Sequence, residues 1–222
     1  MRCILASVTS ASAFVALALV ASSALADDDE PLPRPRPVPV DTRTGRPTLA
    51  AGIAYGRLFG SAEANVPLPS YASWGFLPTF TLSVPVSRHV AIEAWGAFGS
   101  FNNHTADCPT CTAKTWTAGL GASYHLLDGT PFDPWFSAGV GWQQTSLDNG
   151  YAIKLDYGGI VLPRLTVGSD YYPVKYIGFG PWLELQTGRF YSVSGASSAI
   201  IEKDIHSELA AGLRVVLSPF AF

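Results

Sequence analysis

Residues 115–126, Thr-Trp-Thr-Ala-Gly-Leu-Gly-Ala-Ser-Tyr-His-Leu, alternate between two kinds of side chain. The even positions, from Trp116 to Leu126, are apolar or aromatic, and the odd positions are Thr, Gly, Ser or His. Because successive side chains of a strand point to opposite faces, this period of two predicts a β-strand. One face of this strand is apolar and the other is small and polar.

The same alternation recurs along the chain from Thr48 onward. Residues 134–146 repeat it, with Phe136, Val140 and Trp142 opposing glycine, serine and glutamine positions. We expect eight strands near 48–59, 73–86, 88–101, 114–127, 134–146, 157–169, 174–187 and 206–218. Eight consecutive strands of this kind predict an all-β protein, an eight-stranded antiparallel up-and-down transmembrane β-barrel.

Long and short connections alternate between these strands. The segments 60–72, 102–113, 147–156 and 188–205 are long, whereas short turns are expected around Ser87, Asp128-Gly129 and Asp170. Bacterial membrane barrels have short turns on the periplasmic side and long loops outside. An even number of strands then places both ends of the barrel domain on the periplasmic side.

Composition favours a barrel in lipid over a soluble, ligand-carrying barrel of lipocalin type. Only 14% of the residues are charged, against about a quarter in an ordinary soluble domain. The apolar strand faces carry almost no charge and would form a sticky belt in water. Aromatic residues near the strand ends predict two girdles at the membrane interfaces. The girdle next to the long loops would contain Tyr55, Trp74, Trp116, Trp142 and Tyr157. The girdle next to the short turns would contain Tyr124, Phe136, Tyr171, Tyr172 and Tyr176. The net charge of −3, without a basic cluster, excludes nucleic acid as an expected partner.

The chain before the barrel divides into two segments. Residues 1–26 have the features of a secretory signal peptide, with Arg2, an apolar stretch and a final Ala24-Leu25-Ala26. A transmembrane anchor is the alternative for this segment. Residues 27–47 are a Pro-rich tail, expected to be a periplasmic linker or docking peptide. Residues 48–222 are then the barrel domain.

The chain ends in Phe220-Ala221-Phe222. With the strand pattern, this ending resembles the small outer-membrane β-barrel family of OmpA/OmpX type. The resemblance implies an outer-membrane location, contact with outer-membrane lipid, and recognition of Phe220 and Phe222 by the barrel-assembly machinery. Ser218 and Arg214 depart from the apolar register that the family carries before its last residue. Either Pro219 marks a bulge that shifts the register, or the assembly signal is weak.

Charged residues on the polar strand faces are the first candidates for a site. By parity, they are Glu93, Arg164, Glu184, Glu208 and Arg214. The expected arrangement is an ion-pair network that plugs a narrow lumen. The alternative is a gate in a small-solute or ion channel, in which the pairs would rearrange.

Enzymatic chemistry is not expected, and no cofactor-binding or metal site is predicted. Lipid A deacylases and palmitoyltransferases share this architecture, so a lipid-modifying enzyme is a further alternative. The deacylase family requires a His-x-Ser pair and a nearby acid, whereas this chain has His125-Leu126-Leu127 near a turn. The Gly-x-Gly pairs, such as Gly119 and Gly121, lie within strands and suit lumen packing better than nucleotide binding.

Cys108 and Cys111 lie at the tip of the second long loop. In an exported protein they predict a disulfide that stiffens this loop. A metal site with His104 would lack a fourth ligand, and a redox motif would require a thioredoxin-like helix. Taken together, the sequence predicts a non-enzymatic outer-membrane barrel with a structural or surface-interaction role, whose long loops could contact an extracellular ligand.

Overall fold

The computed structural model describes residues 46–63, 66–71, 73–102, 110–127, 130–148, 150, 154–195 and 204–218. The predicted signal peptide and most of the Pro-rich tail lie outside these residues. His104, Cys108, Phe220 and Phe222 also lie outside them. No described helix is long and apolar enough to cross a membrane.

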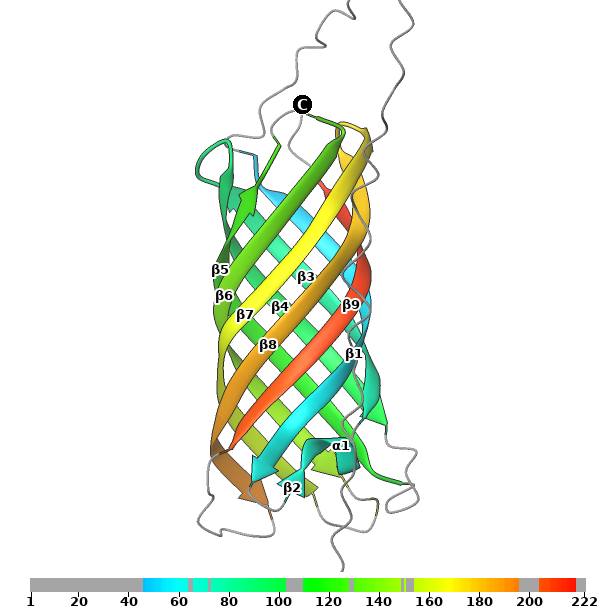
Figure 1. The fold of residues 1–222 in the computed structure, drawn as a ribbon, viewed down its shortest axis with the longest axis vertical. Helices are drawn as coiled ribbons and strands as arrows, with labels where there is room; N and C mark the ends of the chain where they lie inside the picture. Colours follow the sequence, from blue (N-terminus) through cyan, green and yellow to red (C-terminus); the bar gives the residue numbers. More distant parts are fainter. Residues whose placement is uncertain are drawn as a thin grey trace, which may run out of the picture. The chain divides into compact units, whose positions relative to one another are not determined.

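The described residues form an all-β barrel of eight long antiparallel strands (Figure 1). These strands are β1 (Thr48–Glu63), β3 (Trp74–Pro85), β4 (Val90–Asn102), β5 (Thr112–His125), β6 (Phe132–Asp148), β7 (Lys154–Val174), β8 (Ile177–Gly195) and β9 (Ile205–Leu217). Each strand pairs with the next, and β1 pairs with β9 to close the barrel. The predicted fold class is therefore confirmed.

The barrel is narrow because it has only eight long strands. Following paired residues once around it leads from β1 through every long strand and back to β1. The path is Ala50, Thr81, Trp95, Gly119, Gly141, Val161, Gly188, His206 and Gly60. A stagger of ten residues, from Ala50 to Gly60, over eight strands gives an interior that side chains can fill.

One end of the barrel has short connections and the other has long ones. At the short end, residues 86–89 join β3 to β4, and Lys175-Tyr176 join β7 to β8. At the long end, the first loop contains β2 (Val66–Pro67) and the one-turn helix α1 (Leu68–Tyr71). These two ends are called the turn end and the loop end below.

The predicted turn around Asp170 is wrong. Asp170 lies inside β7, and its side chain is buried in the lumen. The actual turn, Lys175-Tyr176, comes five positions later.

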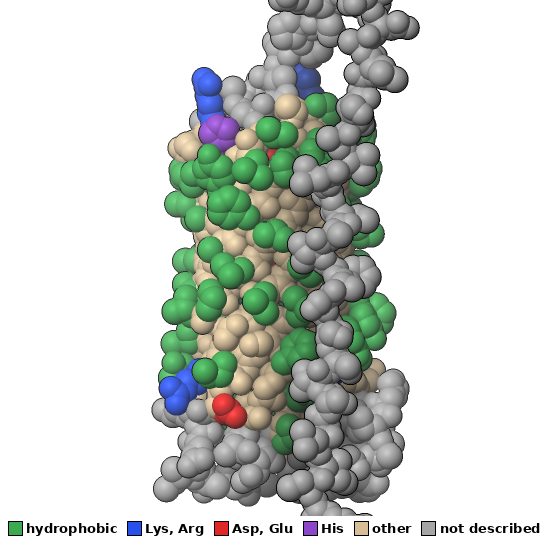
Figure 2. Space-filling model, in the orientation of Figure 1, with side chains coloured by type: hydrophobic (Ala, Val, Ile, Leu, Met, Phe, Trp, Pro, Cys, Tyr) green, Lys and Arg blue, Asp and Glu red, His purple; other side chains and the backbone are tan. Residues whose placement is uncertain are grey.

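The outer face of the barrel is apolar. Along β5, for example, Trp116, Leu120 and Tyr124 are exposed, whereas Thr117 and Ser123 between them are buried. Figure 2 shows hydrophobic side chains along one face, with charged side chains near its two ends. A continuous apolar band bounded by charge is the pattern of a strand face in contact with lipid.

Proline 163 changes which side chains face inward along β7. The register with β8 shifts between Val161 and Arg164, and the register with β6 shifts at the same level. Because one extra residue reverses the alternation, Tyr157 points into the lumen and is fully buried. Its predicted place in the loop-end girdle is therefore wrong. Pro78 on β3 pairs with Ile53 without a register shift, but the pairing of β3 with β4 is interrupted at Leu77 and Pro78.

Glycine residues make room for large side chains in the lumen. A Cβ atom on Gly119 would lie 2.6 Å from the Trp95 ring, and one on Gly141 would lie 2.8 Å from it. A Cβ on Gly168 would lie 2.5 Å from the Trp135 ring. The strand glycines thus pack against tryptophan rings that cross the barrel.

Candidate functional site in the barrel lumen

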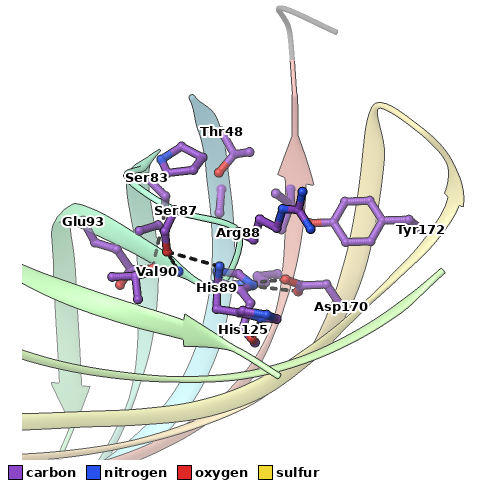
Figure 3. Close-up of a pocket in the computed structure, with 15 residues that line it drawn as sticks. Thr48, Ser83, Ser87, Arg88, His89, Val90, Glu93, His125, Asp170 and Tyr172 are labelled. Atoms are coloured by element: carbon purple, nitrogen blue, oxygen red, sulfur yellow. Dashed lines mark hydrogen bonds and ion pairs between the residues drawn. The ribbon is translucent and has the colours of Figure 1, made fainter. Parts of the chain in front are cut away.

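A small cavity of about 30 Å³ lies at the turn end of the lumen (Figure 3). Arg88 and His89 reach it from the β3–β4 turn, and Asp170 and Tyr172 reach it from β7. The Ser87 hydroxyl accepts hydrogen bonds from the backbone N–H groups of His89 and Val90, at 3.4 and 3.0 Å. Tyr172 lines this cavity, so its predicted place in the outer girdle is wrong.

Arg214 on β9 and Asp170 on β7, which both line this cavity, form a bidentate ion pair on the two sides of β8. The Arg214 Nε and Nη2 atoms donate to the two Asp170 oxygens at 3.0 and 2.6 Å. The guanidinium also lies over the Trp135 ring, 3.7 Å from its centroid. Such a forked pair, stacked on an aromatic ring, fixes both side chains in one geometry.

A second ion pair lies deeper in the lumen. Arg164 on β7 contacts Glu184 on β8, with 2.5 Å between Nη2 and Oε2. Thr166 and Gln186 donate further hydrogen bonds to the Glu184 carboxylate, at 3.1 and 2.5 Å. The Arg164 guanidinium lies over the Trp95 ring, 4.2 Å from its centroid. Both charges are therefore buried with several partners each.

The five charged residues singled out by parity all lie on the lumen face, but they do not form one network. Arg164 pairs with Glu184, whereas Arg214 pairs with Asp170. Ser83 donates to the Glu93 carboxylate at 3.3 Å. Both carboxylate oxygens of Glu208 lack a hydrogen-bond partner among the described residues. The five residues thus belong to two separate ion pairs, one of them completed by Asp170, and contribute two further carboxyl groups.

The loop end of the lumen is filled by apolar side chains. Leu58, Phe101, Tyr157 and Phe190 are almost completely buried, and Leu68 from α1 joins the same cluster. His206 stacks on Phe190 with 4.0 Å between ring centroids. The sequence analysis missed this apolar layer, because an aromatic residue on a strand can face either lipid or lumen.

Ser123, His125 and Asp133 lie together near the turn end. His125 Nδ1 is 2.7 Å from an Asp133 carboxylate oxygen, and His125 Nε2 is 3.3 Å from the Ser123 hydroxyl. The sequence analysis found no such set near His125. This order of groups is that of a serine nucleophile, a base and an orienting acid.

The burial of Ser123 argues against a role as a hydrolytic nucleophile. The residue is 1% exposed and does not line the turn-end cavity. It also lies between two neighbouring strands, paired with Ala91 on β4 and with Ser137 on β6. Because the strand amides bond within the sheet, they are not arranged as an oxyanion hole.

Two other predicted sites fall partly or wholly outside the described residues. Cys111 is buried directly before β5, but Cys108 lies outside the described residues, so the loop disulfide stays a prediction. Phe220 and Phe222 are also outside, so the assembly signal stays a prediction. No group of three or more His, Cys, Asp or Glu residues that could hold a metal ion occurs among the described residues.

A closed eight-stranded barrel, apolar outside and plugged by side chains inside, defines the class of small outer-membrane barrels by fold. Comparison with solved structures supports this. The Neisserial surface protein A aligns with a TM-score of 0.52 and 15% identity, over 76% of this chain and 96% of that protein. The predicted resemblance is thus confirmed at the level of fold.

Two further structures align less well. The outer membrane protein OprG from Pseudomonas aeruginosa has a TM-score of 0.46 and 13% identity, over 78% of this chain and 96% of that one. The attachment invasion locus protein Ail of Yersinia pestis has a TM-score of 0.46 and 10% identity, over 78% and 99%. No protein-family model and no curated protein sequence matches the chain.

Proposed function

We propose that this protein is a non-enzymatic outer-membrane barrel with a plugged lumen and a structural or surface-interaction role. The observation that carries the proposal is the filled lumen. Two ion pairs and an apolar layer follow one another along it, and the two cavities found among the described residues measure about 30 and 20 Å³. About 10–15 Å³ is needed to hold one water molecule, so neither cavity is large enough to carry a solute.

The outer face supports the membrane location. Its exposed side chains include Ile53, Phe80, Leu120, Leu183 and Leu213 on five different strands. In water this surface would drive aggregation, whereas in lipid it is stabilised and the closed sheet leaves no unpaired edge. Outer-membrane lipid is therefore the first partner in this proposal.

Orientation and assembly are part of the same proposal. The short turns at one end favour a periplasmic location for that end, with the N-terminal tail and the C-terminus on the same side. The loop end would then face outward and could contact an extracellular ligand. Phe222, with Phe220, would be read by the barrel-assembly machinery.

We expect no discrete conductance from the protein in a planar lipid bilayer. The Arg164→Ala variant should also be silent, because the apolar layer around Phe101 and Phe190 still closes the loop end. A porin reconstituted in the same way is the positive control. Resolved current steps from the unmodified protein would contradict a plugged lumen.

A gated channel is the second candidate, and one observation favours it. The two lumen cavities share Ala50 and Arg214, so the Arg214–Asp170 pair stands between them. Rearrangement of this pair would join the cavities, although the apolar layer would still lie beyond. Current steps that appear only in Arg214→Ala, and not in Arg164→Ala, would favour this candidate.

A serine hydrolase is not favoured despite the Ser123 geometry. We expect a fluorophosphonate probe to leave the folded protein unlabelled, because Ser123 is buried and has no oxyanion hole beside it. Intact-mass spectrometry checks this directly, with an active serine hydrolase as the positive control. An adduct that disappears in Ser123→Ala would revive the enzyme alternative.

A further inference from the structure

A cavity of about 20 Å³ in the lumen is lined by both Arg164, which is buried, and Arg214, which is partly buried. Arg164 and Arg214 line it together with Trp135, Trp182, Thr79 and Thr81. No carboxylate is among its lining residues. The cavity is therefore bounded by two guanidinium groups, two indole rings and hydroxyl groups, which can all donate hydrogen bonds.

Three donors around this cavity have no partner in the described part of the chain. They are Arg164 Nε, Trp135 Nε1 and Trp182 Nε1. Their residues are 7%, 4% and 7% exposed, so bulk water does not satisfy these N–H groups. Buried donors without partners are rare in folded proteins, and each indicates a water or an ion in contact with it.

The donors point to an anion more than to water. A water molecule accepts about two hydrogen bonds and must place two protons of its own, whereas a halide only accepts. The Thr166 hydroxyl, which also lines the cavity, already donates to Glu184 at 3.1 Å. Three unpartnered N–H groups on residues that line one small cavity thus match an acceptor without protons.

The surrounding charges permit such an anion. Glu184 is paired with Arg164, and Asp170 is paired with Arg214, so the acids next to the cavity are compensated. The Asp170 pair uses Nε and Nη2 of Arg214, which leaves its Nη1 outside that fork. Glu93 and Glu208 do not line the cavity, although Glu208 is close enough to Arg164 and Glu184 to interact with them electrostatically.

We propose that this cavity binds one small monovalent anion, with chloride as the simplest ligand. The anion would satisfy the indole and guanidinium donors and stabilise the folded lumen. This site goes beyond the proposed function, because a plugged barrel does not require an internal anion. It is also independent of that proposal, since a conducting barrel could bind the ion as well.

Bromide tests the site because it resembles chloride and can be located by anomalous scattering. The protein refolded in detergent should unfold at a higher temperature in sodium bromide than in sodium gluconate of equal ionic strength. Trp182→Phe removes one donor, so its apparent bromide affinity should fall about tenfold. Trp116→Phe is the matched control, because the Trp116 indole donates to Gln144 on the outer face.

An anomalous peak inside the cavity of crystals grown in bromide would establish the site. If Trp182→Phe does not fold, Thr81→Val removes a hydroxyl from the same cavity at nearly constant shape. Density for water alone would overturn the proposal. A bromide effect that is equal in the Trp182→Phe and Trp116→Phe variants would overturn it too, since it would then be a general salt effect.

Discussion

Replacing Arg164 with methionine should destabilise the folded barrel by about 3–5 kcal/mol, because it leaves the Glu184 carboxylate buried without its cation. Glu184 is 2% exposed, and its Arg164 contact is 2.5 Å. The remaining donors, Thr166 and Gln186, do not supply a positive charge. Urea unfolding of the protein in lipid vesicles, followed by tryptophan fluorescence, measures the loss.

The double variant Arg164→Met/Glu184→Gln is the informative companion. Removing both charges should recover most of the stability, since a buried pair and a neutral replacement are often close in free energy. Arg88→Met is the control, because Arg88 is exposed at the turn end. A loss below about 1 kcal/mol for Arg164→Met would match an exposed surface pair and contradict the buried pair described here.

Placing an arginine at Leu120 should cost about 2–4 kcal/mol in a lipid bilayer, the range for a charge at mid-membrane depth on the lipid face of a barrel. Leu120 lies in the middle of β5 and is 62% exposed on the outer face. The side chain makes few contacts within the protein, so the cost comes from the lipid. Equilibrium unfolding from phospholipid vesicles measures it.

Leu126→Arg is the matched control for that substitution. Leu126 has the same residue type and a similar exposure, 53%, but it follows β5 at the turn end. Near the membrane interface the same change should cost about 0–1 kcal/mol. Equal effects at both positions would mean that depth has no influence, which would contradict a membrane-spanning outer face.

The period of two in the sequence was sufficient to predict all eight strands and the closed barrel. The alternation of apolar and small polar residues is clearest in residues 115–126, and β5 covers nearly the same range. Strand ends were harder to predict. β8 was expected to end at 187 but continues to Gly195, because strands at the loop end extend beyond the clearly alternating region.

The errors within strands have local and long-range causes. At β7, the register shift near Pro163 reverses the alternation, so the parity that places Arg164 in the lumen no longer applies to Tyr157. Asp170 looked like a turn residue because aspartate favours turns. Its place in a strand depends on Arg214, which is distant in the sequence.

The sequence predicts which charged residues face the lumen, but not which of them form ion pairs. Parity placed Arg164 and Glu184 on the inner face, and they form an ion pair between the adjacent strands β7 and β8. The partners Asp133 and Asp170 were not found, because a period of two gives the face of a residue but not its height or its neighbours across the barrel. The cavity between Arg164 and Arg214 follows only from the three-dimensional stagger of the strands.

The most direct test of a membrane barrel is heat-modifiable gel mobility with circular dichroism of the refolded protein. In detergent or lipid, we predict a compact, faster-migrating form that shifts on boiling, with a β-rich spectrum. Without detergent or lipid, the protein should not reach this form. A stable, soluble β-protein in plain buffer would contradict the account and would favour a soluble barrel.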